Sequence, residues 1–156
     1  MCQVLYISIH RHPFFPDTGS HLNIGEGNGK GYSVNIPWPD TGYTDADYAL
    51  AFLNIVLPIL RQYAPHFIVV SCGFDSAEGD WLGGGGVTPR GYQWMTSKLM
   101  ELPRPDDTPL PLPHSSERGT RSHTTTHTQA THVPLVLALE GGYSLDALRY
   151  STEAVF

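Results

Sequence analysis

The sequence lacks any apolar run long enough to cross a membrane, and it contains very little cysteine. No run of about 18 or more apolar residues occurs, which excludes a transmembrane helix. Cys2 and Cys72 are the only two cysteines, so no disulfide framework exists and a reducing compartment is expected. The first residues also lack the basic and apolar regions of a signal peptide. These absences predict a soluble intracellular protein.

The charge balance is acidic. Charged residues make up 15% of the 156 residues, and the formal net charge of -6 argues against nonspecific binding to nucleic acid. The length suits one domain with a hydrophobic core, and no internal repeat of fixed period is visible. The chain begins almost directly in an apolar segment, whereas domain boundaries normally fall in polar linkers. We therefore expect residues 1–156 to be part of a larger domain.

Three apolar segments each end in a polar residue that could take part in chemistry. They are Val4–Ile9 before His10, Phe67–Cys72 before Gly73-Phe74-Asp75, and Pro134–Leu139 before Glu140-Gly141-Gly142-Tyr143. Continuous aliphatic and β-branched runs favour strands that are buried on both faces of a parallel sheet. Ligands bind at the carboxyl ends of such strands. We therefore expect His10, Asp75 and Tyr143 to gather along one edge of the sheet.

Helix signals separate these strands. Thr44 is a candidate N-cap, with Asp45 and Asp47 in the first turn. An apolar stripe follows at helical period, formed by Tyr48, Ala51, Phe52, Ile55, Val56, Ile59 and Tyr63. Pro58 lies within this stripe and should remove a backbone hydrogen bond and kink the helix.

Two further helices and one short strand complete the pattern. Thr88 and Pro89 predict the start of a helix that continues to about Met100, and Ser144 caps a final helix from about Leu145. Residues 32–36 alternate as a short strand that Pro37 should end. The order β, β, α, β, α, insert, β, α predicts an α/β fold with a mostly parallel sheet.

The segment 102–132 is rich in Pro, Ser, Thr and His and has little that could form a core. This composition predicts a disordered insert. Its histidines include His123 and His127, whose spacing would suit zinc on a helix. The surrounding threonines are poor helix formers, so we expect only adventitious metal binding by these and by His114 and His132.

Asp75 and Tyr143 are the strongest candidates for chemistry. A carboxylate just after a buried strand can bind a hard metal ion or act as a general base, but it can also cap a helix or a turn. Gly141 and Gly142 permit a sharp turn with close approach to a ligand. The Tyr143 phenol could then donate a hydrogen bond to a developing oxyanion, or its ring could simply pack in the loop.

Other candidates have more ordinary interpretations. His10 could be a ligand or a base, but a histidine at a strand end is more often a hydrogen-bonded structural residue. Phe14 and Phe15 could wall an apolar channel or anchor a loop. Cys72 is expected to be a small buried hydrophobe rather than a nucleophile. The glycine run 83–86 lacks the Lys-Ser/Thr of a phosphate-binding loop.

Six blocks of the sequence resemble the zinc-dependent histone deacetylase family, specifically class II. They are VLYISIHRHPFFPDTG, GKGYSVNIPW, DADYALAFLNIVLPIL, VVSCGFDSAEGDWLGG, VTPRGYQWMT and LALEGGYSLDAL. The resemblance covers nearly the whole chain except the insert, and the GFD and LEGGY blocks are highly specific. It implies an arginase-like, three-layer α/β fold with a mostly parallel central sheet, and hydrolysis of the acetyl amide of acetyl-lysine.

The resemblance also implies roles for individual residues. Asp75 resembles the second zinc aspartate, and Tyr143 resembles the tyrosine that polarises the acetyl carbonyl. Phe15 resembles a wall of the acyl-lysine tunnel and Leu82 a residue at its rim, while the glycine pair 141–142 resembles part of the tunnel lining.

The same resemblance implies potassium sites and a subclass within class II. Ser8 and the carbonyl of Ile9 resemble part of one potassium site, and Val4 and Tyr32 resemble members of a second one. Glu140 before the two glycines favours class II over class I. A tyrosine, rather than a histidine, at position 143 resembles the class IIb or yeast class II type.

The family's tandem histidines, in a PGHHA-like block, and its DxHHGNGT-like zinc block are missing. The chain therefore resembles the C-terminal half of a catalytic domain, and we expect it to be inactive by itself. Two alternatives are a non-catalytic interaction module and a polyamine deacetylase, which carries a rim glutamate where this chain has Leu82. Implied partners are acetylated histone or another acetyl-lysine protein, and corepressor proteins, in the nucleus or the cytoplasm.

Overall fold

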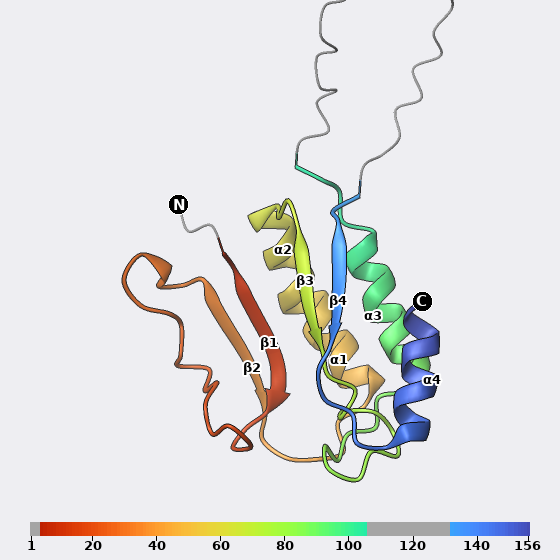
Figure 1. Cartoon of the computed structure of the whole chain (residues 1–156). Helices are drawn as coiled ribbons and strands as arrows, with labels where there is room; N and C mark the ends of the chain where they lie inside the picture. Colours follow the sequence, from red (N-terminus) through yellow and green to blue (C-terminus); the bar gives the residue numbers. More distant parts are fainter. Residues whose placement is uncertain (1–3, 106–131) are drawn as a thin grey trace, which may run out of the picture.

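Two pairs of parallel strands form the β-structure of the residues that the structure describes (Figure 1). The computed structural model describes residues 4–105 and 132–156. The strands are β1 (Tyr6–Arg11), β2 (Ser33–Trp38), β3 (Ile68–Cys72) and β4 (Leu135–Leu139). β1 pairs with β2 and β3 pairs with β4, so Tyr6 lies opposite Ser33 and Ile68 opposite Leu135. The parallel pairing and the element order confirm the predicted α/β class.

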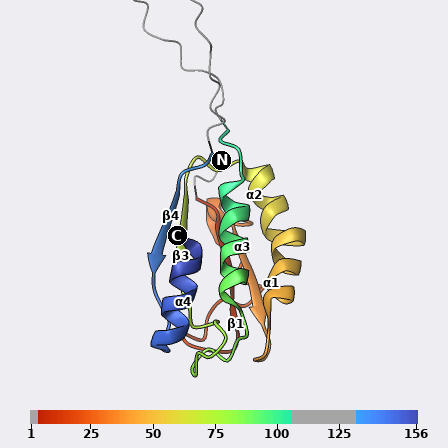
Figure 2. The same cartoon turned by 90° about the vertical axis from the view of Figure 1, so that its right-hand side faces the viewer.

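Helices lie between these strands and after the last of them. They are η1 (Gly27–Gly29), α1 (Asp45–Ala51), the π-helical stretch η2 (Phe52–Val56), α2 (Leu57–Tyr63), α3 (Pro89–Met100) and α4 (Leu145–Val155). Figure 2 shows α1, α2 and α3 on one side of the β3–β4 pair. Leu57 and Leu99 from these helices share a core with Ile68 and Val70 of β3. Within the described residues, no helix is long and apolar enough to cross a membrane.

The prediction that the apolar strands are buried on both faces was wrong for this chain. Along β3, Ile68 and Val70 pack against the core, but Val69 between them is 60% exposed. Val136, which lies opposite Val69 on β4, is 46% exposed. Side chains alternate between the two faces of a strand. Because the described helices cover one face of β3–β4, the other apolar face meets solvent.

Pro58 interrupts the helix as expected, but it does so through a π-helical stretch. In an α-helix residue 58 would donate its backbone N–H to the carbonyl of Asn54, and proline has no N–H. The stretch η2 ends directly before Leu57, whose N–H reaches back to the carbonyl of Phe52. A π-bulge is a common way of absorbing such a defect in a helix.

This wider turn changes which side chains face the core. Ile55 belongs to the predicted apolar stripe, but it is 37% exposed. Leu57 and Leu60, which were outside that stripe, are 1% and 9% exposed. A regular period of 3.6 residues fails here because η2 contains extra residues per turn.

Strand β2 continues through Pro37 to Trp38, so the prediction that Pro37 ends this strand was wrong. Pro37 lies opposite His10 of β1 in the parallel register. Among the described residues β2 pairs only with β1, and an edge strand tolerates a residue without an N–H.

The predicted helix caps are confirmed. The Thr44 N–H donates to Asp47 Oδ2 at 2.7 Å at the start of α1. The Thr88 hydroxyl accepts from the Gly91 N–H at 3.2 Å in the first turn of α3. Ser144 precedes α4, and its hydroxyl accepts from the N–H of Ala147. Each cap satisfies an N–H that the helix itself leaves unpaired.

The ends of the predicted insert belong to the described structure. Leu102 is 3% exposed and its carbonyl accepts from the Val133 N–H at 3.2 Å. Pro103 and His132 form an antiparallel bridge beside the amino end of β4. The rest of the insert, including His114, lies outside the described residues. The point of attachment is therefore at the amino end of β4, opposite the carboxyl end that precedes Tyr143.

Candidate active site

Asp75 lies beyond the carboxyl end of β3, and three glycines surround it. A Cβ on Gly73 would come 3.3 Å from Asp75 Oδ1, and one on Gly141 would come 3.0 Å from Oδ2. A Cβ on Gly83 would overlap the backbone carbonyl of Asp75. Glycine at these positions lets the backbone approach the carboxylate closely without displacing it.

Backbone hydrogen bonds join the turn after β3 to the turn after β4. The Phe74 N–H donates to the Gly141 carbonyl at 2.9 Å, and the Glu140 N–H donates to the Cys72 carbonyl at 3.3 Å. Parallel pairing places the carboxyl ends of both strands together. These bonds extend the contact to the segments that carry Asp75 and Tyr143.

Arg11 brings the end of β1 into contact with the glycine-rich loop. Its Nη1 donates to the Gly83 carbonyl at 2.9 Å, and its guanidinium lies 3.6 Å from the centre of the Phe14 ring. The Tyr43 hydroxyl donates to the same carbonyl at 3.3 Å. The positive charge of Arg11 also acts to lower the pKa of Asp75.

Burial is the main influence on the Asp75 carboxyl. It raises the pKa of Asp75 above its ordinary value, and the negative charge of Asp80 raises it further. Backbone hydrogen bonds from Asp75 and Ser76, and then the positive charge of Arg11, oppose both effects without cancelling them. Ionisation of the half-buried Asp75 carboxyl is therefore unfavourable, and a bound cation would stabilise the carboxylate.

Asp80 accepts hydrogen bonds from four backbone N–H groups. Its Oδ1 accepts from Leu82 at 2.9 Å and Gly83 at 3.1 Å, and its Oδ2 accepts from Tyr143 at 2.6 Å and Ser144 at 3.1 Å. Burial acts to raise the pKa of Asp80, but these four bonds outweigh it and lower the pKa. Asp80 is therefore a fixed anion that links two loops.

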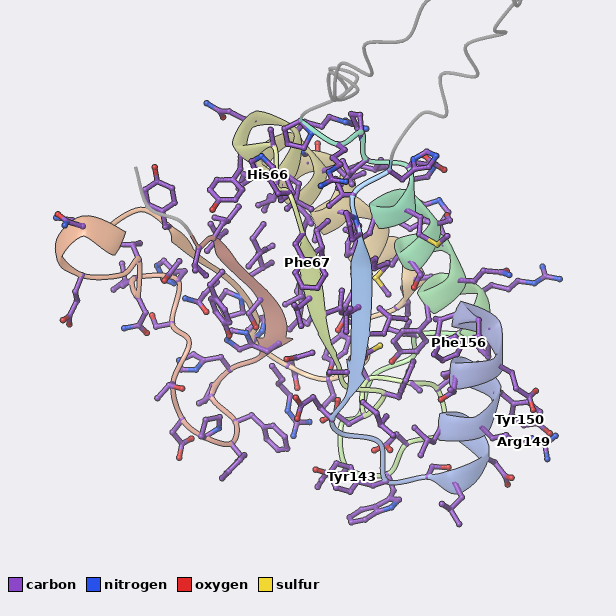
Figure 3. All side chains as sticks on the ribbon, turned by 45° about the horizontal axis from the view of Figure 1, so that its top comes forward. His66, Phe67, Tyr143, Arg149, Tyr150 and Phe156 are labelled. Atoms are coloured by element: carbon purple, nitrogen blue, oxygen red, sulfur yellow. The ribbon has the colours of Figure 1, made fainter. Side chains whose placement is uncertain are left out.

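Tyr143 follows β4 and is half-exposed, with 52% of its surface accessible. In Figure 3 it lies at the opposite end of the strands from His66, which precedes β3. Gly142 before it has φ of +132°, and a Cβ there would come 3.1 Å from Leu148 Cδ1. The turn that presents Tyr143 therefore needs glycine, as expected from the sequence.

His10 does not join Asp75 and Tyr143 through any hydrogen bond that the structure shows. Its Nδ1 lies 2.8 Å from Ser8 Oγ, and its Nε2 lies 2.9 Å from the Gly19 carbonyl oxygen. Because a carbonyl only accepts, Nε2 donates to Gly19, and Nδ1 shares a second hydrogen bond with the Ser8 hydroxyl. This is the structural role that the sequence favoured for His10.

The other candidate residues lie as follows. Leu82 is half-buried in the loop that Asp80 holds, whereas Phe15 is 86% exposed in the loop after β1. Cys72 is half-buried at the end of β3, and burial raises the pKa of its thiol, which disfavours the nucleophilic thiolate. The N–H of Val87 donates to the Ser76 carbonyl at 3.1 Å, so the end of the glycine run is packed against the Asp75 turn.

The four residues assigned to potassium lie on or beside β1 and β2. Ser8 and Ile9 belong to β1, and Val4 precedes it with 71% of its surface exposed. The Tyr32 carbonyl, just before β2, accepts from the Tyr6 N–H at 2.9 Å.

The described residues do not form a complete zinc site by themselves. Within 4–105 and 132–156, no group of three or more His, Cys, Asp or Glu side chains is arranged to hold a metal ion. A catalytic zinc takes three protein ligands and a water. The carboxylate of Asp75 is a suitable ligand for zinc, but further ligands would have to come from outside these residues.

Sequence reasoning missed Asp80, Arg11 and Trp81. Asp80 precedes a glycine-rich turn, and aspartate commonly accepts backbone N–H groups in such turns. That local signal accounts for the bonds from Leu82 and Gly83. No sequence signal points to its bonds with Tyr143 and Ser144, because these depend on the two loops being brought together.

Two solved structures have the same fold. The HD domain of HDA15 superposes with a TM-score of 0.75 at 37% identity, over 97% of this chain and 36% of that chain. The histone deacetylase Clr3 superposes with a TM-score of 0.77 at 36% identity, over 97% of this chain and 22% of that chain. The fold is therefore the arginase-like deacetylase α/β fold that the sequence predicted.

Sequence comparisons give the family. The histone deacetylase domain profile matches residues 2–112. Histone deacetylase 18 of Arabidopsis thaliana is 38% identical over 97% of this chain, and histone deacetylase clr3 of Schizosaccharomyces pombe is 37% identical over 97%. This chain belongs to the zinc-dependent histone deacetylase family and is of the class II type, as predicted. It spans 19% of the length of each of these two relatives.

Proposed function

We propose that this chain forms the carboxy-terminal part of a protein lysine deacetylase domain, which removes the acetyl group from acetylated histone or other acetyl-lysine proteins. The observation that carries the proposal is the joining of two turns. The Phe74 N–H donates to the Gly141 carbonyl at 2.9 Å, and this bond holds the Asp75 turn beside the Tyr143 turn. The Asp75 carboxylate, which would bind the metal, and the Tyr143 phenol, which would donate a hydrogen bond, both follow strands that end at the same edge.

Tyr143 would donate its phenolic hydrogen bond to the oxygen of the acetyl group. That oxygen gains negative charge as water adds to the carbonyl carbon, so the bond strengthens in the transition state. Half of the Tyr143 surface is accessible, which leaves the side chain open to a substrate.

Asp75 would be the contribution of this chain to the zinc site, together with ligands from outside it. Zinc would activate the attacking water and polarise the carbonyl. Binding of the cation would also offset the unfavourable ionisation of this half-buried carboxyl, whose pKa burial raises.

The substrate would be acetyl-lysine rather than an acetylated polyamine. Leu82 would line the tunnel rim without offering a charge to a second ammonium group, and Phe15 would wall the same tunnel. Both side chains suit the apolar stem of lysine. Gly141 and Gly142 would let the tunnel lining approach that stem closely.

Potassium would bind as a second kind of metal ion. Ser8 and the Ile9 carbonyl would contribute to one site, and Val4 and Tyr32 to another. Oxygen ligands of this kind suit hard cations. We further propose action in the nucleus or the cytoplasm, with corepressor proteins as partners.

The 156-residue chain alone should be inactive, and its activity should return in a chimera. The chimera joins the N-terminal half of the catalytic domain of a class II relative to this chain and is assayed with an acetyl-lysine peptide. Asp75→Asn should lower zinc content, because an amide is a poorer ligand than a carboxylate. Tyr143→Phe should retain zinc and reduce kcat by about 10²–10³-fold, as for one oxyanion donor.

Tyr150→Phe provides a matched control, since Tyr150 on α4 is 51% exposed and Tyr143 is 52% exposed. It should leave kcat unchanged. A preference for acetylspermidine over the peptide would contradict the proposed substrate. Zinc-dependent turnover by the 156-residue chain alone would contradict the proposed site. A folded chimera that binds zinc and lacks turnover would favour the alternative, a non-catalytic interaction module.

A further inference from the structure

The Asp80 carboxylate is buried, with 6% of the residue exposed, and nothing in the proposed chemistry uses it. A buried carboxylate needs partners for its charge. Asp80 obtains them as four backbone N–H groups, two on each oxygen. One oxygen holds Leu82 and Gly83 in its own loop, and the other holds Tyr143 and Ser144 after β4. The carboxylate is therefore a link between two loops.

The next residue, Trp81, contacts Tyr143 through other groups. Its indole Nε1 donates to the Tyr143 carbonyl at 3.1 Å. The two rings also meet edge to face, with centroids 6.1 Å apart and planes at 63°. Trp81 is 74% exposed, so its position depends little on burial in a core and mainly on these contacts with Tyr143.

We propose that Asp80 and Trp81 are positioning residues for Tyr143, which together hold its backbone N–H and C=O so that the phenol points in one direction. This inference rests on the proposed function of Tyr143. Asp80 and Trp81 need not touch the substrate. Their role is to fix a turn that would otherwise be free.

Tyr143 needs positioning residues because the turn before it consists of two glycines. Gly142 has φ of +132°, a region open to glycine, and glycine has the greatest backbone freedom of any residue. A flexible turn would spread the phenol over several directions. Because a misplacement of about 1 Å can reduce a rate by about 10²-fold, restricting this turn has a direct catalytic consequence.

Substitutions can separate this role from general stability. Asp80→Asn replaces one acceptor oxygen with an NH₂ group, which cannot accept from a backbone N–H. Asp80→Glu keeps both acceptor oxygens. Trp81→Phe keeps an aromatic ring but removes the indole N–H, and the high exposure of Trp81 makes unfolding by this change unexpected.

The first test uses the 156-residue chain labelled with 3-fluorotyrosine and observed by fluorine NMR. Tyr143→Phe and Tyr150→Phe identify the two resonances that matter. Asp80→Asn and Trp81→Phe should shift or broaden the Tyr143 resonance and leave that of Tyr150 in place. Asp80→Glu should return the Tyr143 resonance toward its original position. Asp146→Asn, in the first turn of α4, should leave both resonances unchanged.

Two results would overturn the proposal. One is a Tyr143 resonance that is unchanged in folded Asp80→Asn and Trp81→Phe chains. The other is an equal disturbance of the Tyr143 and Tyr150 resonances by Trp81→Phe, which would mean that the residue supports the fold in general. Because Trp81→Phe should fold, its Tyr143 resonance still tests the positioning proposal even where Asp80→Asn does not fold.

The second test is a double-mutant cycle in the chimera. Asp80→Asn should reduce kcat on the order of 10- to 100-fold and change KM little. In a chain that already carries Tyr143→Phe, the same change should have almost no further effect, because its action passes through the Tyr143 phenol. Full additivity would refute positioning. An inactive chimera would count against the proposed function, while the fluorine NMR test would still decide this inference.

Discussion

The carboxyls of Asp75 and Asp80 lie in one loop, and the fold displaces their pKa values in opposite directions. Burial raises the pKa of Asp75, with a further contribution from the negative charge of Asp80. Burial also acts to raise the pKa of Asp80, but four backbone N–H groups outweigh it and lower that pKa. In the absence of a metal, the ionised Asp75 carboxylate therefore destabilises the fold, whereas the ionised Asp80 carboxylate stabilises it.

Asp75→Asn should therefore stabilise the metal-free chain at neutral pH. A carboxyl whose folded pKa is raised costs stability above its folded pKa, and that cost disappears below its unfolded pKa of about 3.9. Urea unfolding should show the gain at pH 7 and its decline as the pH falls toward about 4. Asp80→Asn is the opposite case and should destabilise the chain at pH 7. Equal effects of the two changes at pH 7 would contradict the assigned pKa directions.

Asp45 connects the first turns of two helices, and removing its carboxylate should destabilise the fold. Its Oδ1 accepts from the Thr88 N–H at 2.8 Å, and its Oδ2 accepts from the Thr88 hydroxyl at 2.6 Å. Asp45→Ala should lower the free energy of unfolding by about 1–2 kcal/mol, as for a lost cap. Glu153→Gln serves as control, because its exposed pair with Arg149 at 3.4 Å contributes little. Comparable losses in the two variants would contradict this role of Asp45.

Features that depend on neighbouring residues could be predicted from the sequence. Thr44 and Thr88 were identified as N-caps because a cap is formed by residues three or four positions apart. Three strands followed from apolar runs, the short strand at 32–36 from alternation, and the parallel arrangement from the order of elements. The edge that carries Asp75 and Tyr143 followed in turn, because the carboxyl ends of parallel strands share one side.

Features that depend on long-range contacts could not be predicted in the same way. The π-helical stretch before Pro58 changed which side chains face the core, so a regular period misassigned Ile55 and omitted Leu57. The bond from the Tyr143 N–H to Asp80 joins positions 63 residues apart, and no local pattern specifies it. The exposure of Val69 was also unexpected, because an apolar run does not reveal whether both of its faces are covered.

Ser151→Ala should leave the fold unchanged or make it more stable. Ser151 is 1% exposed, and its hydroxyl is one of two buried side-chain groups without a hydrogen-bond partner among the described residues. Removing an unsatisfied hydroxyl avoids its desolvation penalty, and alanine is the better helix former. Ser97→Ala is the matched control in α3, since the Ser97 hydroxyl donates to the Trp94 carbonyl at 2.7 Å. Thermal unfolding should rank Ser151→Ala above Ser97→Ala, and the reverse order would contradict this reasoning.

The open apolar face of β3–β4 should make the isolated chain self-associate. Val69 and Val136 lie opposite each other and are 60% and 46% exposed. Phe67, which lies over β3 in Figure 3, is 54% exposed. Contiguous exposed apolar residues favour association. Val69→Thr combined with Val136→Thr keeps β-branched side chains but makes this face more polar, so the strands should persist while self-association falls. Light scattering at several protein concentrations measures the change. Leu53→Thr, at a helical position that is 55% exposed, is the control and should have little effect. Equal self-association of the double variant and the original chain would show that this face does not drive it.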